Sequence, residues 1–269
     1  MEIRKVNMLY FSPTGTTGKI IRAVTEGIVR ENGFPIGEYD FTRLKDNPPP
    51  IPAFAPDELV LIGMPVYVGR IPRIILPCLE ALEGNNTPCV ILGLYGNRHY
   101  DDYLVELEDL LRPRGFLPIA AAAFIGEHSF SNKLAGGRPN REDLDLARNF
   151  GKNLFAKLAR SKEPPALEEG CIPGHRPYRT FRKAGGNPPA PELGAACTNC
   201  LGCVEACPTG AISPQGPTLI DNLKCILCRS CARACPVGAI EFAYPGYAEH
   251  RDLLVDTYGS IYNTPLIVL

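Results

Sequence analysis

Short apolar runs alternate with helical patterns over the first 161 residues of the chain. Buried strands are predicted at residues 6–11, 59–63, 89–94 and 117–125, with a weaker candidate at 37–41. Apolar residues at helical spacing predict helices at 16–31, 71–82, 101–111 and 141–158. Strands that alternate with helices imply an α/β fold, a doubly wound parallel five-stranded sheet with helices on both faces. Ligands of such sheets bind beyond the carboxyl ends of the strands.

The composition changes after residue 162 and divides the chain. Residues 163–194 are rich in Pro and Gly and basic in their middle, which predicts a linker without regular structure. Residues 1–162 then form a first domain, and residues 195–245 a small, compact cysteine-rich α+β domain. Residues 246–269 are a tail whose apolar end is expected to pack on one of the domains as an extended segment.

Length and charge exclude several classes of protein. The chain has 269 residues, 45% of them hydrophobic, which suits two domains of unequal size. Charged residues make up 21% and the formal net charge is −1, so no nucleic-acid partner is expected. The apolar runs are too short to cross a bilayer, and the N-terminus lacks the apolar core of a signal peptide. We therefore expect a cytoplasmic protein without a membrane span.

Eight of the 11 cysteines lie in two copies of the spacing C-x2-C-x2-C-x3-C-P. Thiolates at this spacing suit iron–sulfur clusters, and the fourth cysteine of each run ligates the cluster of the other run. One [4Fe-4S] cluster is assigned to Cys197, Cys200, Cys203 and Cys235, and a second to Cys225, Cys228, Cys231 and Cys207. Structural zinc usually pairs two C-x2-C knuckles, and dense disulfides belong to small secreted chains. The unit resembles bacterial-type two-cluster ferredoxins in all eight ligands.

The first predicted strand leads into a loop rich in hydroxyl groups. Its residues are Ser12, Thr14, Gly15, Thr16 and Thr17, and a helix is predicted to begin there. Hydroxyls and free backbone N–H groups at a helix N-terminus form an anion site. The lysine of a P-loop and the GxGxxG of a dinucleotide loop are both missing from the sequence, so a monophosphate is favoured. Ser-x-Thr-Gly-x-Thr after the first strand resembles the FMN-phosphate loop of flavodoxins.

The same resemblance implies a flavin-ring site in the loops after the third and fourth strands. Both loops offer tyrosine faces for stacking and glycines that expose backbone groups. The residues assigned to the ring are Pro65, Val66, Tyr67 and Gly69 in the first loop and Tyr95, Gly96, Asn97 and Tyr100 in the second. The alternative for each tyrosine is an ordinary position in a loop.

The whole chain resembles the flavodoxin–ferredoxin fusion proteins of anaerobic bacteria and archaea, in the same domain order. The resemblance implies a flavodoxin-like first domain, FMN, two [4Fe-4S] clusters and electron transfer with an external redox partner protein. An electron carrier is favoured, and no catalytic residue is assigned. The alternatives are a flavin-dependent oxidoreductase that reduces a small substrate over the FMN, and a redox-responsive binding module. The oligomeric state stays open.

The sequence allows two interpretations for each of two segments, residues 126–140 and the basic linker. Residues 126–140 have no counterpart in the family, so they are either a lid over the flavin or a partner-binding loop. For the basic linker we favour a solvated, extended tether. Its alternative is a strap that meets a negative surface, either the clusters or a flavin phosphate.

Overall fold

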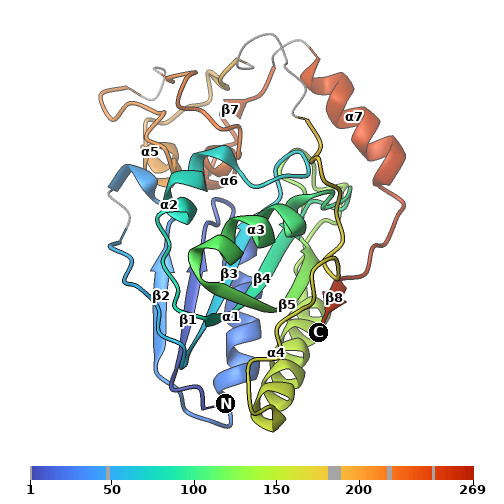
Figure 1. Ribbon diagram of the computed structural model, residues 1–269. Coiled ribbons are helices and arrows are strands. Elements are labelled where there is room, and N and C mark those ends of the chain that lie inside the picture. The colour runs from blue at the N-terminus through green and yellow to red at the C-terminus, as the bar shows by residue number, and fades with distance from the viewer. Residues whose placement is uncertain (1, 47–48, 181–188, 217–219, 244–245) are drawn as a thin grey trace.

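A central sheet organises the computed structural model, which describes residues 2–46, 49–180, 189–216, 220–243 and 246–269. The strand order is β2-β1-β3-β4-β5-β8 (Figure 1). The strands are β1 (Lys5–Tyr10), β2 (Ile36–Asp40), β3 (Glu58–Pro65), β4 (Thr87–Tyr95), β5 (Phe116–Ile125) and β8 (Leu266–Val268). Strands β1 to β5 are parallel, whereas β8 runs antiparallel to β5. The order 2-1-3-4-5 is the flavodoxin-like one, so the predicted fold class is confirmed and β8 is an additional edge strand.

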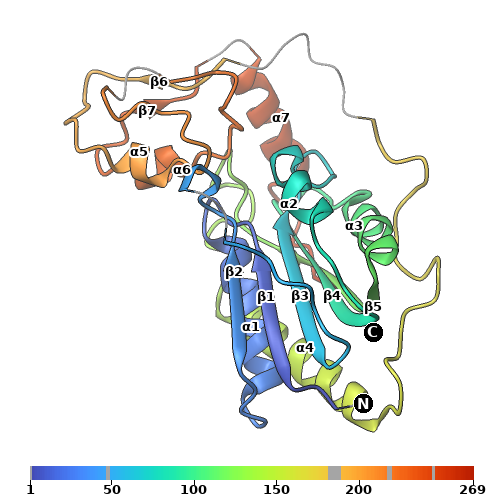
Figure 2. The ribbon, with the colours of Figure 1, turned by 60° about the vertical axis from the view of Figure 1, so that its left-hand side comes forward.

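Helices cover both faces of this sheet (Figure 2). The helices α1 (Thr16–Val29) and α4 (Arg141–Arg160) pack on one face, and α2 (Leu76–Glu80) and α3 (Tyr103–Leu111) on the other. Short 3-10 turns are η1 (Leu44–Asp46), η2 (Arg73–Ile75) and η3 (Arg112–Arg114). The helix expected at 71–82 is divided into η2 and α2, because Pro77 has no N–H to continue a helical hydrogen-bond ladder.

Side chains that alternate along the strands build a core on each face of the sheet. In β5, Ala121 belongs to the core under α3, and Phe124 belongs to the core under α1 and α4. The helices α1 and α4 touch through their backbones. A Cβ atom on Gly151 would lie 2.1 Å from the carbonyl oxygen of Val24 in α1. A Cβ atom on Gly27 would lie 2.0 Å from the carbonyl oxygen of Arg148 in α4. Glycine at these two positions therefore sets the distance between the helices.

Residues 163–180, expected to be part of a solvated tether, are instead bound to the first domain, and this segment is here named the strap. Leu167 and Ile172 are buried in the core on the α3 side of the sheet, and the segment runs outside α3 in Figure 2. The negative surface that its described part meets is a pair of carboxylates on α3, because Arg176 forms ion pairs with Asp109 and Glu108. Residues 181–188 of the predicted linker lie outside the described residues.

The C-terminal tail returns to the sheet. Strand β8 pairs with β5, with Ile267 opposite Ala122, so an extended segment does dock on the first domain. Helix α7 (Tyr247–Tyr258) precedes it and lies outside the predicted elements. Only two of its side chains are buried, Tyr247 and Leu254, which lie seven residues apart on one face.

The cysteine-rich unit sits over the carboxyl ends of the parallel strands (Figure 1). It contains α5 (Gly202–Ala206), α6 (Ser230–Ala234), and a small sheet of β6 (Glu192–Leu193) and β7 (Ile240–Glu241). Direct contacts join it to the first domain: Lys45 Nζ donates to the Val204 carbonyl at 2.7 Å, and Ser230 Oγ donates to the Pro13 carbonyl at 2.7 Å. The two units are therefore held together by more than the chain between them.

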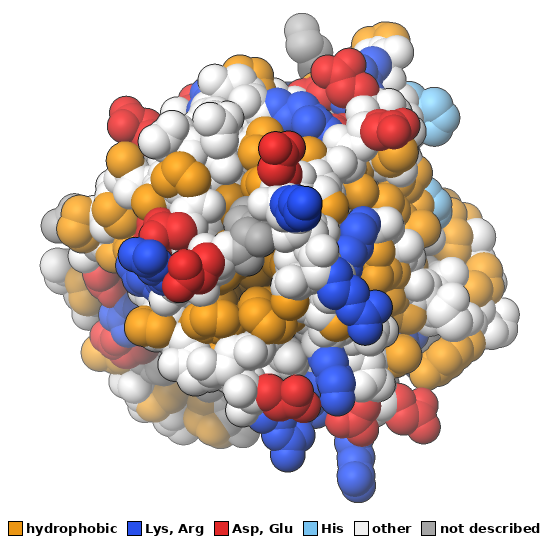
Figure 3. Space-filling view, turned by 60° about the horizontal axis from the view of Figure 1, so that its bottom comes forward, with side chains coloured by type: hydrophobic (Ala, Val, Ile, Leu, Met, Phe, Trp, Pro, Cys, Tyr) orange, Lys and Arg blue, Asp and Glu red, His pale blue; other side chains and the backbone are white. Residues whose placement is uncertain are grey.

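The surface shows no single dominant charge on the face drawn in Figure 3. Lys and Arg side chains there are intermingled with Asp and Glu, and hydrophobic side chains lie between them. This mixture agrees with the formal net charge of −1. Within the described ranges, every helix is too short or too polar to cross a membrane.

Candidate functional site

The loop after β1 directs its residues toward the carboxyl edge of the sheet. Gly15 has a φ of 79°, in the left-handed region, and immediately precedes the first residue of α1. A Cβ atom on Gly15 would meet nothing within 4 Å, so the space beside it is open. Ser12 Oγ accepts a hydrogen bond of 2.9 Å from Gly18 N, which fixes the loop on the first turn of the helix. Ser12 therefore supports the loop and does not itself line the cavity beside it.

A small cavity of about 70 Å³, here named the hydroxyl cavity, lies beside this loop. Thr14, Thr16 and Thr17 line it from the loop, and Pro65, Val66 and Tyr67 line it from the end of β3. The Thr17 hydroxyl is buried, and the described residues offer it no hydrogen-bond partner. A buried hydroxyl without a partner is costly, so a bound ligand with oxygen acceptors would fit this site.

The loop after β3 ends in a tight turn. Tyr67 and Arg70 exchange two backbone hydrogen bonds of 3.0 Å around Val68 and Gly69. Both central residues have positive φ, 54° and 79°, as in a type I′ turn. Gly69 is required because a Cβ atom there would lie 2.1 Å from Asp101 Oδ2. For the β-branched Val68 this backbone conformation is costly, and such strain gathers at functional sites.

A larger cavity of about 310 Å³, here named the ring cavity, adjoins the hydroxyl cavity. Val66, Tyr67, Tyr95 and Gly96 line both cavities, and Gly69 lines the larger one. Burial raises the pKa of Tyr67 well above its usual value, and the nearby Cys228 thiol adds to the rise. Burial likewise raises the pKa of Tyr95 to about 12. Both phenols are therefore neutral at neutral pH and present uncharged aromatic surface.

Three residues that were assigned to the ring do not line the ring cavity, and one of them, Pro65, lines only the hydroxyl cavity. Asn97 is 1% exposed, and its side-chain Nδ2 donates to the carbonyls of Tyr258 and Ile261 at 2.9 and 2.8 Å. Its amide therefore anchors the tail after α7. Tyr100 packs edge-on against Tyr95 and stacks on a neighbouring histidine, outside the residues that line the ring cavity. The resemblance to flavodoxins assigned Asn97 to the flavin ring, but in the structure its amide binds residues 258 and 261 of the tail.

His128 and Ser129 line both cavities, Glu127 lines the hydroxyl cavity and Phe130 the ring cavity, so the segment 126–140 forms one wall of the site. His128 Nδ1 accepts a hydrogen bond of 3.0 Å from Phe130 N, which leaves Nε2 as the nitrogen that carries the proton of the neutral ring. Burial, together with the charges of His250 and Arg98, lowers the pKa of His128 to about 4. The imidazole is therefore a neutral hydrogen-bond donor at neutral pH.

Several lining residues escape sequence analysis because they come from distant segments. The strap, the second cysteine run and α7 each send side chains to the ring cavity. These residues are Arg179, Ile226, Leu227, His250 and Leu254, together with Arg98, His99, Ser129 and Phe130 from nearer loops. No local pattern marks them, because only the folded chain brings these segments to one edge of the sheet.

Four cysteines line a third cavity, here named the thiol cavity. They are Cys207, Cys225, Cys228 and Cys231. Cys207 belongs to the first run and the other three to the second, so the structure brings together one predicted ligand set. Burial raises the pKa of Cys228 and of Cys231 to about 12. Thiolates at such buried positions require the positive charge of bound iron, and the residues present fit a cluster.

The other predicted set consists of Cys197, Cys200, Cys203 and Cys235. Burial raises the pKa of Cys203, and the charges of Cys197 and Cys200 add to the rise, so these three thiols are neighbours. Cys235 directly follows α6, whose last carbonyl oxygen lies 3.5 Å from the Cβ position of Gly202 at the start of α5. The end of α6 thus meets the first run. The assignment of Cys235 to this cluster stays a prediction.

Backbone hydrogen-bond donors lie close to sulfur atoms of the cysteine-rich unit. Ala239 N lies 3.2 Å from Cys235 Sγ as a hydrogen-bond donor, and such bonds stabilise thiolates and tune their potentials. In the part of the chain that the structure describes, no group of three or more His, Cys, Asp or Glu side chains is placed to hold one metal ion. The thiols of the second run surround a space, as a cube-shaped cluster requires.

Comparison with known families identifies the cysteine-rich unit. Residues 196–239 match the family model described as a 4Fe-4S dicluster domain. This stretch contains all eight cysteines of the two runs, so the prediction of two [4Fe-4S] clusters and of a redox role is confirmed. No curated protein matches the chain.

The first domain is similar to solved flavodoxin structures. A flavodoxin from the domain Archaea is 15% identical, covers 58% of this chain and 99% of its own, and has a TM-score of 0.40. Oxidised flavodoxin 1 from Bacillus cereus is 19% identical, with coverages of 57% and 97% and a TM-score of 0.40. A WrbA-like flavodoxin from Agrobacterium tumefaciens is 14% identical, with coverages of 59% and 99% and a TM-score of 0.39. The fold itself follows from the strand order, so the chain joins a flavodoxin-like domain to a dicluster domain.

Proposed function

We propose that the protein is an electron carrier that holds FMN at the edge of the sheet and two [4Fe-4S] clusters in the cysteine-rich unit. The observation that carries the proposal is the position of Cys228. It lines the hydroxyl cavity and the thiol cavity at once, so the flavin site and a cluster site share a wall. When bound, the flavin exchanges two electrons and each cluster exchanges one.

The residues of the hydroxyl cavity suit the phosphate of FMN. Thr14 and Thr16 lie with their hydroxyl oxygens 3.3 Å apart, and the Thr17 hydroxyl is buried beside them. The N-terminus of α1 adds a positive dipole end at the same place. A dianionic monophosphate would meet hydroxyl donors and the helix end together, as the loop sequence predicts.

The residues of the ring cavity suit the flavin ring. Tyr67 and Tyr95 offer neutral aromatic faces, and neutral His128 has a donor N–H available on Nε2. Leu227 and other apolar side chains from the cysteine-rich unit limit the access of water. Because the two units touch directly, each presents its site to the other at high effective concentration.

Cofactor analysis of one anaerobically purified sample tests the proposal. About eight iron atoms and one FMN per chain are expected. Iron without FMN would contradict the flavin half of the proposal and leave the first domain as a scaffold. Zinc in place of iron would contradict the cluster half.

A second candidate function is favoured by a fourth cavity, here named the basic cavity, of about 550 Å³. It shares His128, Ser129 and Phe130 with the ring cavity. Its charged lining residues are Lys133, Arg229, Arg233 and Arg251, against Glu127 and Asp252. This excess of positive charge beside the flavin site suits an oxidoreductase with a small anionic substrate.

A reoxidation experiment separates the two functions. The reduced protein is mixed with a series of small carboxylates and with their neutral amides. An oxidoreductase of this kind should be reoxidised by a carboxylate and slowed by Lys133→Ala. A carrier should show no difference between carboxylates and amides, and should transfer electrons only to protein acceptors.

A further inference from the structure

The two cysteine runs have the same spacing but differ in the residues between their cysteines. The first run carries Thr198, Asn199, Leu201 and Gly202, and the second carries Ile226, Leu227, Arg229 and Ser230 at the corresponding positions. Because the cysteines themselves are conserved between the copies, these substitutions are not needed to bind a cluster. Their positions in the fold indicate another purpose.

All four residues of the second run contact the first domain or its cavities. Ile226 and Leu227 line the ring cavity together with Tyr67. Ser230 Oγ donates to the carbonyl of Pro13, which directly precedes Thr14. Arg229 Nη1 also lies 3.4 Å from the carbonyl oxygen of Phe130, another residue of the ring cavity.

The corresponding residues of the first run face away from the flavin site. Thr198 and Asn199 are exposed, and Leu201 is 38% exposed. Gly202 has no side chain with which to make the bond that Ser230 makes. The first half of the unit does touch the first domain, but through Lys45 and the end of α5, outside the hydroxyl and ring cavities.

We propose that residues 226–228 form a wall of the FMN site and that one cluster lies nearer to the flavin than the other. The cluster held by Cys207, Cys225, Cys228 and Cys231 is the flavin-side cluster, and the cluster of the first run is the outer one. The inference rests on the proposed function. The residues that differ between the two runs thus specify which cluster faces the flavin.

Reciprocal exchange of residues between the runs tests this inference. Ile226→Thr gives the second run the residue of the first, and Thr198→Ile does the reverse. Both side chains are β-branched, so the backbone preference is unchanged, and no ligand is touched. Ile226→Thr is expected to weaken FMN binding about tenfold through lost apolar contact, with full iron content. Thr198→Ile is expected to leave FMN binding unchanged.

FMN titration of the flavin-free, cluster-loaded protein gives the affinities through the quenching of flavin fluorescence. Equal affinities in both variants, or a loss only in Thr198→Ile, would overturn the inference while wild-type FMN binding upholds the proposed function. If the wild type contains both clusters and binds no FMN, the proposed function itself fails. The two failures are therefore distinguishable.

Electron paramagnetic resonance of the reduced clusters provides a second readout that does not depend on affinity. Each variant is expected to alter the signal of the cluster nearest to its substitution, which assigns the two signals. Addition of FMN to the flavin-free wild type should then change the signal that Ile226→Thr alters. A change confined to the signal that Thr198→Ile alters would reverse the assignment of the clusters and overturn the inference.

Discussion

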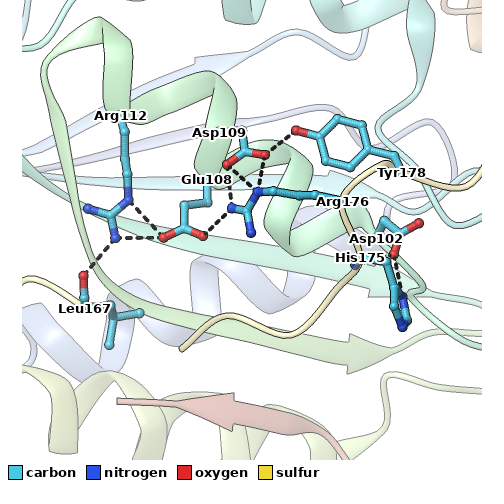
Figure 4. A network of polar contacts seen from close by, with 8 residues as sticks. All are labelled: Asp102, Glu108, Asp109, Arg112, Leu167, His175, Arg176 and Tyr178. Atoms are coloured by element: carbon cyan, nitrogen blue, oxygen red, sulfur yellow. Dashed lines mark hydrogen bonds and ion pairs between the residues drawn. The ribbon is translucent and has the colours of Figure 1, made fainter. Parts of the chain in front are cut away.

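Arg176 of the strap forms a two-point ion pair with Asp109 of α3, with contacts of 2.5 and 2.8 Å (Figure 4). The same guanidinium reaches Glu108, which is 1% exposed and is also bound by Arg112 at 2.7 Å. The Tyr178 hydroxyl donates to Asp109 Oδ2, the oxygen that also accepts from Arg176 Nε. The strap is therefore held by a network around two carboxylates of one helix, and it ends near Arg179 at the ring cavity.

We expect Arg176→Ala to loosen the strap. The side chain is about half exposed, so the loss of its charge-assisted bonds should cost about 1 kcal/mol and lower the unfolding midpoint by about 2–4 °C. Thermal unfolding and limited proteolysis within residues 163–180 measure the two effects. Arg160→Ala, at the exposed end of α4, is the matched control. Equal midpoints and equal cleavage in both variants would show that the network does not hold the strap.

We expect Gly151→Ala to destabilise the first domain. The new Cβ atom would overlap the Val24 carbonyl of α1, and forcing the two helices apart costs about 1–3 kcal/mol. Lys152→Ala removes an exposed side chain from the next position of the same helix and is the control. Denaturation of both variants gives the difference in the free energy of unfolding. A Gly151→Ala variant as stable as the control would mean that the helices separate without cost.

The parallel strands and the position of the hydroxyl-rich loop could be predicted because their signals are local. The apolar runs of β1 and β3 are buried on both sides, and the hydroxyl loop directly follows β1. The short α2 could also have been predicted, because Pro72 and Pro77 interrupt the apolar pattern that suggested one long helix.

Other parts of the site depend on contacts between distant segments. Asn97 follows β4, as a flavin contact of this fold would, but the tail from Tyr258 to Ile261 binds its amide. Arg179 reaches the ring cavity only because Arg176 fixes the strap on α3. Neither outcome has a signature in the neighbouring residues, since each depends on where a remote segment of the chain docks.

We expect Thr17→Val to weaken FMN binding without weakening the fold. The hydroxyl is buried without a partner among the described residues, so its removal costs the free protein nothing. A hydrogen bond to a charged phosphate contributes about 1.5–3 kcal/mol, which corresponds to a loss of affinity of about 10- to 100-fold.

Thr25→Val is a close control for this variant. Thr25 lies on the same helix, and its hydroxyl is also buried and without a partner in the described part of the chain. It does not line the hydroxyl cavity. Fluorescence titration with FMN should show weaker binding only for Thr17→Val, and unfolding midpoints should not fall in either variant. Equal affinities would remove Thr17 from the phosphate site.

We expect His128 to make the protein less stable in acid. Burial, together with nearby positive charges, lowers its pKa in the folded protein from 6.5 to about 4. Between these two pH values the unfolded chain binds a proton that the folded protein does not, so the free energy of unfolding falls as the pH drops from about 6.5 to about 4. The positive or titratable groups that face the ring are His250, Arg98, Arg229 and Arg233.

His128→Asn isolates this contribution. The asparagine keeps an acceptor for Phe130 N–H and does not titrate, so the variant should lose less stability than the wild type between about pH 6.5 and 5. Above about pH 7 the difference between the two proteins should be constant. His175→Asn removes an exposed imidazole and controls for the loss of a histidine as such. Thermal unfolding across this pH range measures all three proteins. Parallel curves for the wild type and His128→Asn would mean that His128 gains a proton as readily in the folded protein as in the unfolded chain.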